Sequence, residues 1–210
     1  MTRAALFDLD GTLIDSRADL CAAGNVARAA IGLPPITVAE LGGMVGDGAS
    51  KLIERLTPDA DAVQRAAALA AFKTAYAAGC CDRTTMYDGI PALLETLAAR
   101  GWALAVVTNK PLSFTLRILD HLGLRRFFPI IEGGDGPRKP DPGQLVAALR
   151  ALGAAAPASW MIGDHHTDLR AGAAAGCRTL FCRWGFGHAG DAACDAAADA
   201  PGAVAAAIGA

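Results

Sequence analysis

The chain has 210 residues, of which 53% are hydrophobic and 19% are charged, so it fits one domain, or one domain with an insertion, and is not disordered. Its formal net charge at pH 7 is −2, which provides no basic surface for nucleic acid or for an anionic membrane. No apolar run reaches the roughly 18 residues of a membrane-spanning helix, and the residues before Asp8 are too few for a signal peptide, so we expect a cytoplasmic protein.

Five short apolar runs are predicted to form β-strands. Most of them are continuous rather than alternating, which is typical of strands covered on both faces in a parallel sheet. The runs are residues 4–9, 102–108, 129–132, 160–163 and 179–183. Helical patterns at residues 89–100, 113–122, 142–152 and 168–175 alternate with them. This alternation predicts an α/β fold, a doubly wound parallel sheet with a Rossmann-like core.

The interval after the first strand carries helix signals instead of strand patterns. Ser16 is expected to cap a helix over residues 17–31, and Thr37 with Glu40 has the spacing of a capping box. A further helix is predicted over residues 58–78. These signals predict a block of helices inserted just after the first strand.

We therefore divide the chain into two predicted domains. Residues 1–15 and 85–210 form the Rossmann-like catalytic core, and residues 16–84 form an inserted α-helical cap. The alanine-rich stretch after Asp191 is interpreted as a last helix. The six cysteines include no CxxC pair and no zinc-finger spacing, so we interpret them as reduced thiols.

Polar side chains stand at the ends of three predicted strands and before one of them. They are Asp8 and Asp10 after the first, Thr108 and Asn109 after the second, Lys139 before the fourth, and Asp164 and Asp168 after it. Because ligands of an open α/β sheet bind at the carboxyl ends of its strands, we expect these side chains to converge on one crevice.

The four aspartates place four negative charges in that crevice, against one positive charge from Lys139. Two like charges about 4 Å apart repel by roughly 4 kcal/mol at an effective dielectric constant near 20. Such a cluster is stable around a cation, and an all-oxygen set of ligands suits Mg²⁺. Mg²⁺, a lysine and a hydroxyl can together bind a phosphoryl group and stabilise its negative charge, so we expect Mg²⁺ as the cofactor.

Each motif has a plainer interpretation when taken alone. The aspartate pair fits a strand end followed by a turn, Thr108 and Asn109 fit a helix cap, and Lys139 fits a solvated loop. The presence of all the motifs in order favours the shared site. Asp168 could cap the helix that begins there, bind near the metal, or do both.

The set Asp8-x-Asp10-Gly11-Thr12, Thr108-Asn109, Lys139-Pro140 and Gly163-Asp164-x3-Asp168 resembles the four motifs of the haloacid dehalogenase-like hydrolases in order and spacing. The helical insertion lies where that superfamily carries a C1 cap. Segments 44–49 and 107–111 are similar to those of bacterial phosphoglycolate phosphatases.

The sequence departs from that family at three places. His165 stands where the family usually has serine, and Asp47 replaces a common asparagine. The segment 184–188, which ends at His188, is as similar to the N-acetylmuramic acid 6-phosphate phosphatases. We interpret His165 and His166 as residues at the rim of the crevice or just behind its metal ligands, because adjacent side chains diverge and imidazole is a poor ligand for Mg²⁺.

The resemblance implies roles for the core residues. Asp8 would be the nucleophile that forms an aspartyl-phosphate, and Asp10 the acid and then the base. Asp8, the backbone carbonyl of Asp10 and Asp164 would bind Mg²⁺, with Asp168 orienting bound water. Thr108 and the Asn109 amide would hold phosphate oxygens, and Lys139 would stabilise the transferring group.

The resemblance also implies a small-molecule phosphomonoester as the partner, with 2-phosphoglycolate favoured and N-acetylmuramic acid 6-phosphate or another sugar phosphate as the alternative. A cationic cap residue should meet the substrate carboxylate, and the candidates are Lys51, Arg55 and Arg17, with Lys51 ranked first. The sequence leaves the oligomeric state open.

Three other functions are compatible with part of this pattern. Phosphomutases keep both aspartates, so the sequence does not exclude a mutase. A phospho-accepting signalling module also gathers Asp, Thr and Lys around Mg²⁺, but it is shorter and carries no cap. A phosphatase-like scaffold without turnover is disfavoured by the intact motifs.

Overall fold

The computed structural model describes residues 2–210, and its centre is a six-stranded sheet. The strand order is β5-β4-β1-β6-β7-β8, and every neighbouring pair is parallel. The strands are β1 (Ala4–Phe7), β4 (Ala103–Val107), β5 (Ile130–Glu132), β6 (Trp160–Gly163), β7 (Arg178–Cys182) and β8 (Ala196–Ala198). The doubly wound parallel sheet predicted from the sequence is therefore confirmed.

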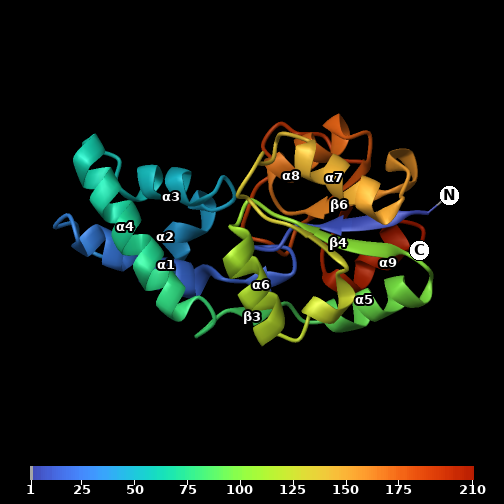
Figure 1. Ribbon diagram of the computed structural model, residues 1–210, viewed down its shortest axis with the longest axis horizontal. Helices are drawn as coiled ribbons and strands as arrows, with labels where there is room; N and C mark the ends of the chain where they lie inside the picture. The colour runs from blue at the N-terminus through green and yellow to red at the C-terminus, as the bar shows by residue number, and fades with distance from the viewer. Residues whose placement is uncertain (1) are drawn as a thin grey trace.

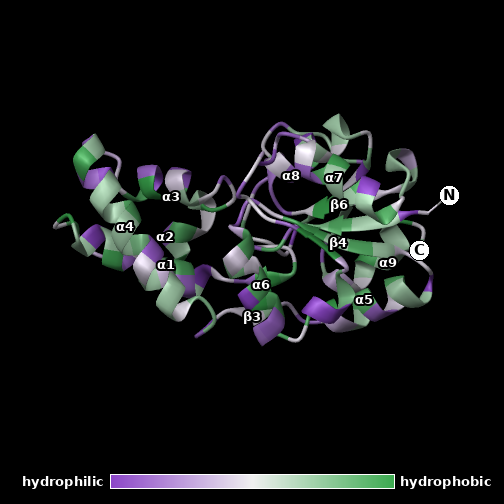
Figure 2. Cartoon of the chain, viewed as in Figure 1, coloured by the Kyte–Doolittle hydropathy of each residue, from purple (hydrophilic) through white to green (hydrophobic). Residues whose placement is uncertain are grey.

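Helices cover both faces of this sheet (Figure 1). One face carries α7 (Gly143–Leu152) and α8 (His166–Ala174), and the other carries α5 (Ile90–Ala99), α6 (Leu112–His121) and α9 (Val204–Ala207). Because successive side chains of a strand point to opposite faces, β1 sends Ala4 and Leu6 into one core and Ala5 and Phe7 into the other. Figure 2 shows the resulting hydrophobic strands β4 and β6 between the helical layers.

A separate group of helices stands beside the sheet (Figure 1). It consists of α1 (Arg17–Ala29), α2 (Val38–Leu41), α3 (Ala49–Leu56) and α4 (Ala62–Gly79), and α1 packs along α4. We call this group the cap and keep residues 16–84 as its proposed boundaries. Short 3₁₀ turns complete the fold at Gly42–Met44, Arg125–Phe127, Ala156–Ala158 and Pro201–Ala203.

A two-stranded antiparallel ribbon joins the cap to the core. The chain leaves the core through β2 (Ile14–Asp15) and returns through β3 (Thr85–Met86). This ribbon is not predicted from the sequence, because a strand of two residues carries no periodic pattern.

Some local predictions about the cap are corrected. The Ser16 hydroxyl does not cap α1 and donates instead to the Asp10 carboxylate. The capping box of Thr37 and Glu40 is confirmed. The last cap helix begins at Ala62 rather than at residue 58, because Asp61 caps it with Gln64 as its reciprocal partner.

The prediction of a last helix after Asp191 is largely wrong. That stretch forms the edge strand β8, which pairs with β7, and only α9 is helical. Alanine has a high helix propensity, but pairing with the exposed edge of a sheet overrides it. All six cysteines are free thiols. Within residues 2–210, no helix has the length and apolar character needed to cross a membrane.

Asp19, near the start of α1, fastens the returning chain. Its carboxylate is 3% exposed and accepts hydrogen bonds from the backbone N–H of Thr84 at 2.8 Å, from the Thr84 hydroxyl at 2.8 Å and from the N–H of Arg83 at 3.0 Å. The two ends of the insertion are thereby held together.

We expect Asp19→Ala to lower the free energy of unfolding by about 2–3 kcal/mol, because it leaves buried donors without an acceptor. Urea denaturation followed by circular dichroism measures this loss. The control is Asp59→Ala, an exposed cap residue, for which the change should stay within about 0.5 kcal/mol. Equal stability of the two variants would contradict the fastening role.

Candidate active site

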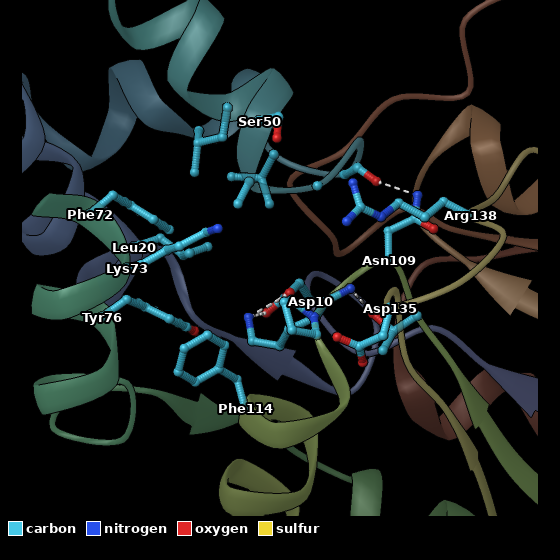
Figure 3. A pocket seen from close by; sticks show the side chains of 18 of the residues that line it. Asp10, Leu20, Ser50, Phe72, Lys73, Tyr76, Asn109, Phe114, Asp135 and Arg138 are labelled. Atoms are coloured by element: carbon cyan, nitrogen blue, oxygen red, sulfur yellow. Dashed lines mark hydrogen bonds and ion pairs between the residues drawn. The ribbon is translucent and has the colours of Figure 1, made fainter. Parts of the chain in front are cut away.

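The carboxyl-terminal edge of the sheet gathers the polar residues that follow its central strands. Asp8 and Asp10 after β1, with Thr108 and Asn109 after β4, line a cavity of about 600 Å³. Its opposite wall comes from the cap helices α3 and α4. Figure 3 shows side chains from both parts of the molecule pointing into this cavity.

Three carboxylates form a buried cluster behind this surface. One oxygen from each of Asp8, Asp164 and Asp168 lies within 4.8 Å of the other two. Burial raises the pKa of Asp8 to about 6, against the opposing effect of Lys139. Burial, with the charges of Asp8 and Asp168, also raises the pKa of Asp164 well above its ordinary value. Such a cluster binds either protons or a cation.

Glycines allow the backbone to approach Asp164 closely. A Cβ on Gly11, whose φ is +86°, would lie 2.0 Å from the Asp164 carboxylate, and one on Gly185 would lie 2.3 Å from its Cβ. The same carboxylate accepts hydrogen bonds from the backbone N–H of Phe186 at 3.1 Å and of Gly187 at 2.7 Å. Its position is therefore fixed by two separate loops.

Lys139 lies within the carboxylate cluster. Its Nζ is 2.9 Å from Asp8 and 2.6 Å from Asp168, and it donates to the Val107 carbonyl at 2.6 Å. Burial acts to lower the pKa of Lys139, but the charges of Asp168 and Asp8 raise it above its ordinary value. The ammonium therefore stays protonated and offsets part of the negative charge.

A second lysine, Lys110, pairs with Asp10. Its Nζ lies 2.7 Å and 2.9 Å from the two Asp10 oxygens and 4.9 Å from the centre of the Tyr76 ring on α4. Lys139 was the one balancing charge expected from the sequence, and the structure adds Lys110 as a second. Its position directly after Asn109 could have suggested that Lys110 lies near the site, but the direction of its side chain could not be predicted from the sequence.

The Asn109 side chain connects the end of β4 to the Lys139 backbone and to the cap. Its Nδ2 donates to the Lys139 carbonyl at 2.9 Å and to the Gly46 carbonyl of the cap at 3.0 Å, and its Oδ1 accepts from the Lys139 N–H. The side-chain amide is therefore engaged, whereas the Asn109 backbone N–H has no acceptor among residues 2–210. Thr108 is buried beside it, and its Oγ1 accepts from the Lys110 N–H.

Asp168 does not cap the helix that follows β6, as the sequence allowed. This helix begins at His166, and His165 is its cap. Asp168 lies in the first turn, where it accepts from the His165 N–H at 3.0 Å and from Lys139 at 2.6 Å. It therefore supports both the helix start and the charge cluster.

The three cap cations predicted to meet the substrate do not line the cavity. Lys51 pairs with Glu54 at 2.7 Å, and its side chain is 58% exposed. Arg55 pairs with Asp47, and Arg17 pairs with Asp15. The cavity is lined instead by Ser50, Lys73 and Arg138, which the sequence analysis did not select.

His165 and His166 do not diverge, as was expected of adjacent side chains. Their ring centroids are 4.0 Å apart, and the ring of His188 lies 4.9 Å from His165. Burial lowers the pKa of His165 to about 4, with a further lowering from His166.

The sequence of this chain is similar to those of known proteins. The family model described as haloacid dehalogenase-like hydrolase matches residues 5–182. A phosphoglycolate phosphatase of Rhodospirillum rubrum is 39% identical over 196 residues, covering 89% of this chain and 81% of the relative. One from Xanthomonas campestris is 36% identical over 186 residues, covering 88% and 84%.

A solved structure, described as a predicted phosphoglycolate phosphatase from Haemophilus somnus, is also similar to this chain. The two are 26% identical and superpose with a TM-score of 0.90, over 97% of this chain and 96% of the other.

The pKa of Asp8 makes stability depend on pH in the metal-free protein. Its folded-state value of about 6 lies above the ordinary 3.8, so the folded protein binds more protons than the unfolded chain between these values. The free energy of unfolding, relative to Asp8→Asn, should therefore fall by about 2.4 kcal/mol as the pH rises from about 4 to about 7.

Urea denaturation of both proteins in EDTA, at several pH values in this range, measures that difference. The lowered pKa of His165 acts in the opposite direction over the same range. His165 is present in both proteins, and the Asp8 charge influences its pKa less than burial and the other neighbouring groups do, so the comparison removes most of this effect. A difference that does not change with pH would show that Asp8 is not the titrating group.

Proposed function

Because this chain belongs to the haloacid dehalogenase-like hydrolase family, we propose that it hydrolyses 2-phosphoglycolate to glycolate and phosphate, with Mg²⁺ and an aspartyl-phosphate intermediate. The chain is a phosphoric monoester hydrolase, as its relatives named phosphoglycolate phosphatase indicate. The observation that carries the mechanism is the buried cluster of Asp8, Asp164 and Asp168, with two lysines, at the edge of one cavity.

The donor set fits the proposed metal. All three clustered side chains offer carboxylate oxygens, which hard divalent cations prefer, and their burial makes an uncompensated charge costly. Asp8, Asp164 and the backbone carbonyl of Asp10 would hold Mg²⁺, and Asp168 would orient its water. When bound, Mg²⁺ would offset the repulsion between Asp8 and a phosphate dianion.

The remaining steps belong to residues of this chain. Asp8 attacks phosphorus while the bond to the leaving alcohol breaks, and Asp10 gives that alcohol a proton. Asp10 then takes a proton from water, which attacks the aspartyl-phosphate, releases phosphate and restores Asp8. Lys139, 2.9 Å from Asp8, stabilises charge on the transferring group.

Three further groups would hold the reactants in place. Thr108 and the backbone N–H of Asn109, which has no acceptor among residues 2–210, would bind the phosphate oxygens. Lys110 contacts both carboxylate oxygens of Asp10 and so fixes its direction toward the leaving group.

Lys73 supports a carboxylate-bearing substrate. It projects from α4 into the cavity (Figure 3) and forms no ion pair with the described residues. A cation on the wall opposite the phosphate site suits the second anionic group of 2-phosphoglycolate. We therefore propose Lys73, in place of Lys51, as the residue that contacts the substrate carboxylate.

A sugar phosphate remains the second candidate. The cavity, at about 600 Å³, has more room than a two-carbon ester fills. This observation favours N-acetylmuramic acid 6-phosphate or a hexose phosphate as the alternative.

Asp8→Asn and Asp10→Asn should fail in different ways. Asp8→Asn should abolish turnover of every ester, because no phospho-enzyme forms. Asp10→Asn should still release p-nitrophenol in a burst from p-nitrophenyl phosphate, whose leaving group needs no proton, while 2-phosphoglycolate stalls. Rapid-mix kinetics with Mg²⁺ measures both, and an EDTA arm should show no activity. Equal losses on both esters in Asp10→Asn would contradict its role as the acid.

Lys73→Ala should lower kcat/KM for 2-phosphoglycolate by about ten- to a hundred-fold, which corresponds to a charge-assisted hydrogen bond of roughly 1.5–3 kcal/mol. The value for glycerol phosphate, which has no carboxylate, should change little. Lys51→Ala is the matched control, since Lys51 lies outside the cavity and pairs with Glu54.

The same assay tests the substrate. If a sugar phosphate exceeds 2-phosphoglycolate tenfold in the parent enzyme, the substrate proposal is wrong. If 2-phosphoglycolate is preferred and Lys73→Ala keeps that preference, only the assignment of Lys73 is wrong.

A further inference from the structure

Three of the four histidines of this chain form a cluster outside the catalytic cavity. His165 follows β6, His166 begins α8, and His188 lies in the loop after β7. Their ring centroids are 4.0 Å, 4.9 Å and 5.2 Å apart, and one nitrogen from each ring lies within 4.8 Å of the other two. None of the three lines the catalytic cavity.

Two nitrogens of this cluster are buried without a hydrogen-bond partner among residues 2–210. They are Nε2 of His165, a residue only 2% exposed, and Nδ1 of His166. A buried polar atom that lacks a partner destabilises the fold by about 1–3 kcal/mol, so two such atoms in one cluster need an explanation. A bound cation that accepts a lone pair from each nitrogen would remove this cost.

The cluster is held in place by its surroundings. Nδ1 of His165 lies 3.0 Å from the Thr167 hydroxyl and 3.5 Å from the Thr167 backbone N. When Nδ1 carries the ring proton and donates it to the hydroxyl, the ring is fixed and Nε2 keeps a lone pair for a ligand. The His166 N–H donates to the His188 carbonyl at 2.8 Å, which ties the third histidine to the start of α8. The site is therefore built from backbone contacts as well as from the rings.

The cap loop closes one side of the cluster. A Cβ on Gly46 would lie 2.9 Å from the His165 ring, so this glycine lets the loop pack against the imidazole. The next residue, Asp47, interacts electrostatically with both His165 and His166. Its negative charge lowers the cost of placing a cation there.

The cluster coincides with the departures of this sequence from the family it resembles. His165, Asp47 and the segment that ends at His188 are far apart in the chain, yet they meet at this one place. The phosphatase chemistry uses none of them. The proposed phosphatase mechanism therefore gives no reason for the three histidines to lie together.

We propose that His165, His166 and His188 bind a divalent transition metal of the zinc class, such as Zn²⁺, Co²⁺ or Ni²⁺, at a site separate from the carboxylate cluster. Imidazole nitrogens suit these ions, whereas the carboxylates suit Mg²⁺. Tetrahedral ligands about 2.1 Å from zinc are about 3.4 Å apart. The rings therefore draw together on binding, chiefly through the exposed His188.

Cobalt titration tests this site without relying on enzyme activity. The full-length protein is stripped with EDTA, exchanged into excess Mg²⁺ to occupy the carboxylate cluster, and titrated with Co²⁺ under visible spectroscopy. We expect one equivalent to bind with a d–d spectrum of nitrogen and oxygen ligands. Calorimetry with Zn²⁺ should give the same stoichiometry.

Histidine variants locate the bound ion. His166→Ala and His188→Ala should each weaken Co²⁺ binding at least tenfold, and the matched control His121→Ala, which removes the exposed fourth histidine on α6, should not. Cooperative thermal unfolding without added Co²⁺ checks that each variant folds.

Three results would overturn the proposal. They are unchanged binding in both His166→Ala and His188→Ala, a sulfur-to-cobalt charge-transfer band that reveals a cysteine site, or loss of binding in Asp164→Asn with the histidine variants unaffected. Because no readout depends on turnover, this outcome is independent of the proposed substrate.

Discussion

The buried charge at the carboxyl-terminal edge of β1 and β6 is the constraint on which the active-site loops depend. Asp8, Asp164 and Asp168 share a small volume away from water, and Lys139 contacts two of them. An isolated buried ion is costly, so each carboxylate must be paired, hydrogen-bonded or bound to a cation. The loops supply these partners through Lys139, the N–H groups of Phe186 and Gly187, and the close approach at Gly11.

The same constraint reaches the cap through Asn109. This side chain holds the Lys139 backbone on one side and the Gly46 carbonyl of the cap on the other. Asn109 therefore joins the lysine that balances the cluster to the cap loop that lines the cavity. Lys110 makes a comparable link, since it pairs with Asp10 and lies over the Tyr76 ring of α4.

The sequence predicted the parts of this arrangement that follow from periodicity and strand ends. Short continuous apolar runs marked the central strands, and residues after parallel strands converge whatever the loops do, so Asp8 and Asp164 could be expected to lie together. Lys73 and Lys51 were not distinguishable, because which face of a short helix borders a cavity depends on packing with distant elements. The histidine cluster was missed for a similar reason, as His188 reaches His165 only through the loop after β7.

The β2–β3 ribbon makes the helical insertion structurally separable from the sheet. Asp15 pairs with Thr85 and Ile14 with Met86, so the two ends of the inserted segment stand side by side. An insertion whose ends already meet adds little strain to the parent fold, and its length costs little loop-closure entropy. Lineages can therefore exchange, enlarge or delete the helical module as one genetic unit while inheriting the catalytic edge unchanged. Under the proposed role of Lys73, such exchanges would change the substrate preference and leave the reaction mechanism as it is.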